Sequence, residues 1–173
     1  MERQPTIAAI LWPLLTGAAA IFLALAPLSG AAPGLQAPHW LLLALLFWAA
    51  RRPWTTPPML VFVLGLVFDL LRDGPIGAEL FAMLLMVEAI RGWRARQAPF
   101  RFVTEWMRFC LAVFGFELVL FGLLTATYAP TPAIGLVLER MLVTMAAYPL
   151  AAYALQRLSG ARLDERRFTH LTR

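Results

Sequence analysis

The chain has 173 residues, of which 61% are hydrophobic and 14% are charged, and its formal net charge is +5. Soluble domains are close to half apolar and a quarter charged, so this composition excludes an ordinary soluble domain. A basic chain can bind nucleic acid through clustered cations, but here the arginines stand in short segments between apolar stretches, where positive charge orients membrane helices. We therefore expect a single-domain membrane protein that contacts lipid and binds no nucleic acid.

Six apolar stretches predict an all-α fold, a polytopic bundle of transmembrane helices. In chain order they lie near residues 7–28, 36–50, 58–72, 76–91, 102–128 and 133–156. About 20 apolar residues cross the hydrocarbon core, so a chain of this length has room for roughly six spans. The first stretch follows a short basic start, as in a secretory signal, but it exceeds the usual ~15 apolar residues and contains Pro13, so a retained helix is expected. The second has a clean apolar core only from Trp40 to Ala50, a length that also suits a re-entrant segment.

The positions of the arginines favour six crossings with both termini in the cytoplasm. In that topology 12 of the 15 arginines are cytoplasmic, Arg72 alone is external, and Arg108 and Arg140 lie within spans. Between the fourth and fifth spans the cytoplasmic arginines are Arg91, Arg94, Arg96 and Arg101. Removing the second span would place that group outside, against the positive-inside rule. We predict a transmembrane domain over residues 1–158 and a basic cytoplasmic tail over residues 159–173.

Ionisable side chains within the spans are candidate functional groups, because charge is costly in hydrocarbon. Glu117 lies near mid-membrane, and Glu139 and Arg140 lie about a third of the way along the sixth span. They could form a proton relay or a substrate pocket. Alternatively, Glu117 pairs with Arg140 or Arg108, or is protonated against a neighbouring helix, and we favour this structural interpretation. Glu105 and Arg108 lie near a span end, where an ion pair or extension to the interface would suffice.

No enzymatic arrangement is recognisable in the sequence. His39 and His170 fall on opposite sides of the membrane in the predicted topology, no His/Cys/Asp cluster has metal-ligand spacing, and no glycine-rich phosphate loop is present. We expect no catalytic residue, no metal site and no cofactor.

The most informative segment joins the third span to the fourth. Gly65 allows close helix contact, Asp69 and Arg72 stand at the outer end of the third span at a spacing that puts them on one helical face, and Pro75 and Gly77 form a tight turn into a helix that Pro75 can begin. Taken alone, these residues predict a transmembrane hairpin with a capped turn.

Together with the six spans, this segment resembles the rod shape-determining protein family MreD. The family carries a Gly-Leu-x-x-Asp-Leu-Leu stretch followed by a Leu/Ile-Gly turn. The matching residues are Gly65, Leu66, Asp69, Leu70, Leu71, Ile76 and Gly77. The resemblance implies a component of the bacterial inner membrane in the elongation complex that directs lateral peptidoglycan synthesis. It implies association with MreC and, through the complex, with MreB, RodA and a penicillin-binding protein.

The resulting hypothesis is a non-catalytic membrane scaffold that binds the transmembrane helix of MreC. Small residues that could seat a neighbouring helix are Gly115 and Gly122 on the fifth span and Ala147 and Ala151 on the sixth. The alternative is a substrate-binding subunit of a vitamin-type transporter, which the chain resembles in size and topology, although its outer loops are short and poor in hydrogen-bonding residues. An ion pathway through Glu117 is a third hypothesis.

Overall fold

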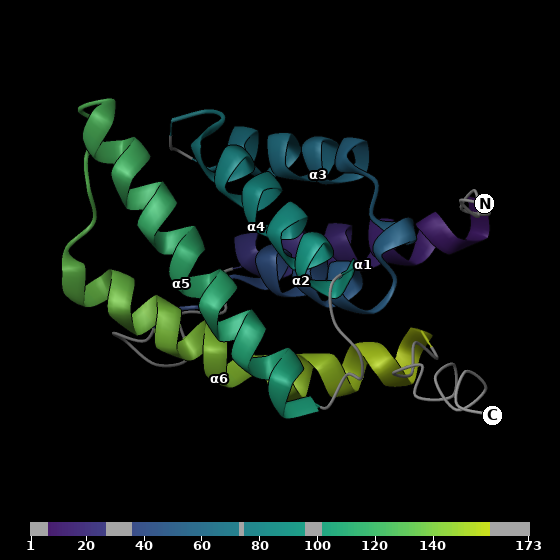
Figure 1. The fold of residues 1–173 in the computed structure, drawn as a ribbon. Helices are drawn as coiled ribbons and strands as arrows, with labels where there is room; N and C mark the ends of the chain where they lie inside the picture. The colour runs from purple at the N-terminus through teal and green to yellow at the C-terminus, as the bar shows by residue number, and fades with distance from the viewer. Residues whose placement is uncertain (1–6, 27–35, 73–74, 96–101, 160–173) are drawn as a thin grey trace.

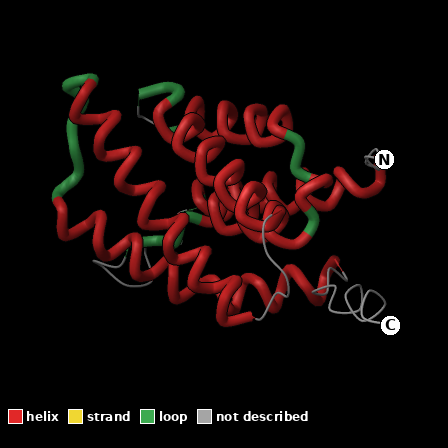
Figure 2. The backbone as a smooth tube through the Cα atoms, viewed as in Figure 1, coloured by secondary structure: helices red, strands yellow, loops and turns green. Residues whose placement is uncertain are grey.

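The computed structural model describes residues 7–26, 36–72, 75–95 and 102–159, and it contains six α-helices there (Figure 1). They are α1 (Ile7–Leu25), α2 (Trp40–Arg51), α3 (Pro58–Leu71), α4 (Ala78–Ala95), α5 (Phe102–Ala126) and α6 (Ile134–Ser159). A short 3₁₀ helix, η2 (Pro53–Thr55), joins α2 to α3. In Figure 2 every regular segment of the described chain is helical. The all-α prediction is confirmed, and each predicted span overlaps one helix.

Helix length separates α5 and α6 from the others. These two are long and apolar enough to cross a membrane by composition and length. By contrast, α2 has 12 residues and α3 has 14, which at ~1.5 Å per residue is shorter than the ~30 Å hydrocarbon core. Six crossings and cytoplasmic termini therefore remain predictions.

The short helix α2 is the centre of the bundle. Every residue from Leu41 to Arg51 is buried, and the helix contacts α1, α4 and α6. A helix that is apolar all round is expected in a core rather than at an interface with water. Because protein surrounds α2, its 12 residues do not need to match the thickness of a bilayer.

Helix α6 lies at the edge of the bundle and turns an apolar stripe outward. Its buried side chains are Thr144, Tyr148 and Ala152, four residues apart. The opposite stripe is exposed and comprises Leu142, Ala146, Leu150 and Tyr153. Figure 1 shows α5 and α6 separating toward the loop that joins them.

The bundle has two ends with different chemistry. We call the end with the α3–α4 turn and the α5–α6 loop the turn end, and the opposite end, where α2 finishes with Arg51, the arginine end (Figure 1). At the arginine end, Arg91 of α4 donates to Glu88 over 2.6 Å. Arg94 lies within α4. Predicted cytoplasmic residues outside the described part of the chain are Arg3, Arg96, Arg101 and the tail from residue 160 on.

Candidate functional site

Asp69 organises the turn between α3 and α4. Its Oδ2 accepts hydrogen bonds from the backbone N–H of Gly77 over 2.7 Å and of Leu80 over 3.3 Å. Free N–H groups at a helix start are commonly satisfied by such a carboxylate. Gly77 adopts φ +97°, a conformation that glycine tolerates and side chains disfavour. Asp69, which the sequence marks as a costly intramembrane acid, is 5% exposed. Its two hydrogen bonds cap the start of α4.

Gly65 brings α3 and α4 into close contact, as the sequence predicts. A Cβ atom at this position would lie 2.7 Å from Leu80 Cδ1 and 3.3 Å from Leu80 Cα. The second atom belongs to the backbone, so the helices would have to separate to admit a side chain. Pro75 does not begin α4 as predicted, because the helix starts at Ala78 and Pro75 lies in the turn before it.

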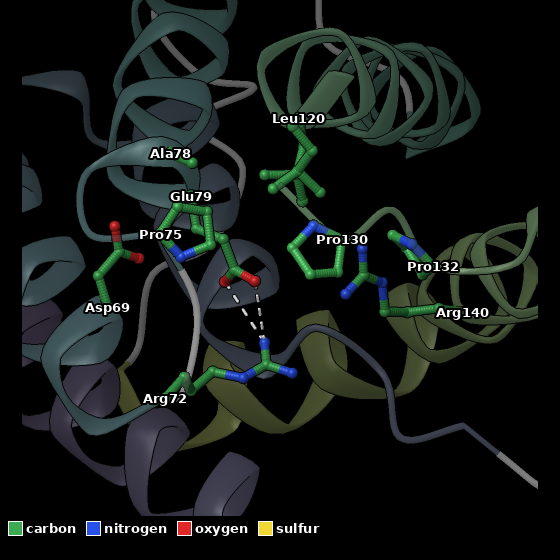
Figure 3. Close-up of a pocket in the computed structure, with 10 residues that line it drawn as sticks. Asp69, Arg72, Pro75, Ala78, Glu79, Leu120, Pro130, Pro132 and Arg140 are labelled. Atoms are coloured by element: carbon green, nitrogen blue, oxygen red, sulfur yellow. Dashed lines mark hydrogen bonds and ion pairs between the residues drawn. The ribbon is translucent and has the colours of Figure 1, made fainter. Parts of the chain in front are cut away.

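Arg72 departs from the predicted helical face. Helix α3 ends at Leu71, and Arg72 has an extended backbone (φ −114°, ψ 141°), so its side chain is not in helical register with Asp69. Its Nη1 instead donates to Glu79 Oε1 over 3.1 Å (Figure 3). His39 Nε2 lies 3.3 Å from Glu79 Oε2, while His39 Nδ1 accepts the N–H of Leu42. Glu79 thus links the turn to the start of α2.

Glu117 and Arg140 form a bidentate ion pair between α5 and α6. The distances are 3.0 Å from Arg140 Nε to Glu117 Oε1 and 2.7 Å from Nη2 to Oε2. One of the expected pairings of Glu117 is confirmed, and the partner is Arg140. Glu139 does not join this pair, because its Oε1 accepts the backbone N–H of Gln36 over 3.0 Å. These contacts fasten α6 to α5 and to the segment before α2.

A cavity of about 420 Å³ opens at the turn end (Figure 3). We call it the turn-end cavity. Charged side chains and apolar residues of α5 share its wall with the proline-rich loop before α6. Its lining residues are Asp69, Arg72, Pro75, Ala78, Glu79, Leu120, Leu124, Pro130, Pro132 and Arg140. The structure therefore gathers Asp69, Arg72, Pro75 and Arg140 from the predicted candidates into one site.

A second polar group, the arginine-end cluster, was not predicted. Arg51 donates to Glu105 through Nε over 2.9 Å and through Nη2 over 3.3 Å, and its Nη1 donates to Gln156 over 3.0 Å. Tyr148 donates its hydroxyl to Glu105 over 2.6 Å. Glu105 is 2% exposed, and it forms an ion pair, one of the two outcomes expected at this span end, with Arg51 of α2 as the partner. No sequence signal indicated this cluster, because an arginine after an apolar run is typical of a cytoplasmic loop.

Gly115 and Gly122 lie on one side of α5 but differ in what they contact. A Cβ at Gly115 would lie 3.0 Å from Met86 Sδ of α4 in the same chain, whereas nothing lies within 4 Å at Gly122. Ala147 and Ala151 are half-buried against the core. Gly115, Ala147 and Ala151 therefore pack within the chain, and Gly122 is open.

The family model for the rod shape-determining protein MreD matches residues 4–153, more than half of the chain. The chain belongs to the MreD family. No curated protein and no solved structure matches it. Membership makes the chain a cell-shape-determining membrane protein.

The MreD-like motif has a clear structural role in this member of the family. Gly65 sets the distance between α3 and α4, Asp69 caps α4, and Gly77 permits the turn. Within the described ranges, no group of three or more His, Cys, Asp or Glu side chains is arranged to hold a metal ion. The motif thus builds the hairpin that forms one wall of the turn-end cavity.

Proposed function

We propose that this MreD-family chain is a non-catalytic scaffold of the bacterial inner membrane that binds MreC within the bilayer and supports lateral peptidoglycan synthesis. RodA, a penicillin-binding protein and MreB would be reached through the same complex. The observation that carries the proposal is the outward stripe of α6. It is apolar over Leu142, Ala146, Leu150 and Tyr153, on a helix long enough to span a membrane.

The packing of α6 supports its use as a docking surface. Of the most apolar 18-residue segment of α6, only 11% is buried inside the chain, compared with 39% for the corresponding segment of α5. In a bilayer, helices associate through close packing rather than by escape from water, so small side chains at the contact favour association. Ala146 is the small residue at the centre of the stripe, with leucines on both sides.

The charges at the two ends support the proposed orientation. The arginine end carries Arg51, Arg52 and Arg91, and the turn end carries Arg72 in a short turn. Positive charge is retained on the cytoplasmic side of bacterial membrane proteins. We therefore orient the arginine end toward the cytoplasm and the turn end toward the periplasm, with the helices making multiple passes.

The test replaces Ala146 by Trp and measures recovery of MreC with the affinity-tagged chain in mild detergent. A bulky ring in the stripe should reduce MreC recovery severalfold and give rounded cells when this variant is the sole copy, since the helices can no longer approach. The matched control is Ala18→Trp, because Ala18 is an exposed alanine on α1, away from the stripe. Equal MreC recovery with both variants would rule out the α6 stripe, and normal rods after depletion of the chain would rule out the scaffold.

The transport-subunit alternative gains one observation, the turn-end cavity beside Asp69 and Glu79. Such a subunit would hold a small ligand there and associate with an ATPase module. Family membership supports the scaffold instead. The same purification distinguishes the two hypotheses, because a transport subunit would recover an ATPase module in place of elongation proteins.

A further inference from the structure

The turn-end cavity has unused hydrogen-bond donors on two arginines. Arg72 contacts Glu79 through Nη1 alone, and Arg140 contacts Glu117 through Nε and Nη2. A guanidinium carries five N–H donors. Among the described residues, Nη2 of Arg72 and Nη1 of Arg140 therefore have no hydrogen-bond partner, and both side chains line the cavity (Figure 3).

Most carboxylate oxygens around the cavity are already engaged by donors. Asp69 Oδ1 has no hydrogen-bond partner among the described residues, but this atom is buried from solvent. Asp69 Oδ2 accepts two backbone N–H groups, Glu79 is held by Arg72 and faces His39, and Glu117 is held by Arg140. What the wall offers to a ligand is therefore the remaining guanidinium N–H groups. Forked donors of this kind match a phosphate or a carboxylate.

An apolar groove of about 260 Å³ lies on the other side of the Glu117–Arg140 pair, between α5 and α6. Glu117 belongs to its wall, and Arg140 belongs to the wall of the turn-end cavity, so the ion pair separates the two spaces. The remaining lining of the groove is hydrocarbon, including Phe114, Leu118, Phe121, Leu138 and Met141. Because Glu117 and Arg140 are in direct contact, the two spaces meet at this ion pair.

We infer that this paired site binds a phospholipid, with its phosphate at Arg72 and Arg140 in the cavity and one acyl chain in the groove between α5 and α6. Cationic donors beside an apolar groove complement a lipid that has an anionic head group and an apolar chain. A free phosphate would contact the arginines but leave the groove empty. The inference rests on the chain lying in a bilayer and on the described contacts, and it does not require MreC.

Native mass spectrometry of the delipidated full-length chain in mild detergent tests the inference. With phosphatidylglycerol as the probe, the wild-type chain should retain one lipid, and Arg72→Gln should weaken retention about tenfold, the effect of losing one charge-assisted hydrogen bond. Leu138→Trp should also weaken retention, because the ring fills the groove. Arg91→Gln is the matched control, since Arg91 lies at the arginine end and pairs with Glu88.

Two further probes identify what is bound. Diacylglycerol of the same acyl composition should bind weakly, because it lacks the phosphate, and millimolar inorganic phosphate should not displace phosphatidylglycerol. Displacement by inorganic phosphate would show a free-anion site and overturn the lipid. Equal retention by Arg72→Gln and Arg91→Gln, or unchanged retention by Leu138→Trp, would also overturn the inference. MreC recovery with Arg72→Gln should stay normal, so this test fails independently of the scaffold.

Discussion

Two interhelical ion pairs differ in their surroundings: Arg51–Glu105 joins α2 to α5, and Glu117–Arg140 joins α5 to α6. In the arginine-end cluster, the Arg51 and Glu105 side chains are 2% and 1% exposed. The space beside the cluster is about 10 Å³, no more than one water molecule needs. At the turn end, Arg140 is 16% exposed and borders a cavity of about 420 Å³. One pair is sealed in protein, and the other faces an open space.

The difference separates structural charge from charge that can serve a ligand. Arg51 uses Nε, Nη1 and Nη2 on partners in α5 and α6, and its guanidinium lies 4.6 Å from the Phe47 ring centroid. A buried, fully satisfied network rigidifies packing. Arg140 and Arg72 retain donors that face the cavity, so the turn end is where binding chemistry remains available.

The largest effect is expected from Arg51→Gln. The substitution leaves the Glu105 carboxylate buried without its cation, which costs about 3–5 kcal/mol of folding stability. The purified chain should show a strongly lowered unfolding temperature in detergent, measured by thermal unfolding with size-exclusion detection. Little recovery of folded chain would agree with the same mechanism.

The double variant Arg51→Gln/Glu105→Gln is the control for this mechanism. Removing both charges eliminates the uncompensated carboxylate, and neutral replacements of a buried pair are often tolerated. The double variant should therefore be more stable than the single one. A double variant that is less stable than Arg51→Gln would contradict the view that the buried charge, rather than lost packing, is the cause.

An intermediate effect is expected from Arg140→Gln, at about 2 kcal/mol, because Arg140 borders the turn-end cavity and loss of its guanidinium opens the Glu117 carboxylate to water there. Glu117→Gln and the double variant complete a double-mutant cycle, and a coupling energy of about 1–3 kcal/mol should appear in chemical unfolding. A loss as large as that of Arg51→Gln would show that the turn-end pair is as sealed as the other. Strictly additive losses would show that the two side chains do not interact.

Much of the fold is predictable from the sequence because apolar run length and turn residues are local signals. Each of the six stretches became a helix, and the start of α3 at Pro58 agrees with the preference of proline for a first helical turn. The surroundings of α2 were not predictable, since an apolar run looks alike whether lipid or protein covers it. Only the packing of α1, α4 and α6 around it distinguishes the two.

The site was predictable to the extent that its contacts are local. Asp69, Gly65 and Gly77 act within one hairpin, and their roles follow from spacing and turn chemistry. Contacts between distant segments were not predictable: Arg51 meets Glu105 across 54 positions and Tyr148 meets Glu105 across 43. The pairing of Glu117 with Arg140 could be proposed, because intramembrane charges require partners, but sequence could not choose between Arg140 and Arg108.

The smallest effect on stability is expected from Arg72→Gln. The Arg72 side chain is 44% exposed, and its ion pair with Glu79 is open to water, so the loss should stay below about 1 kcal/mol. The unfolding temperature should be close to that of the wild type and of Arg91→Gln, measured in the same detergent.

Because Arg72→Gln removes donors from the turn-end cavity without disturbing the bundle, a loss of lipid retention in this variant reports on the site itself. A fall in stability as large as that of Arg140→Gln would place Arg72 with the structural charges and remove the distinction between the two ends.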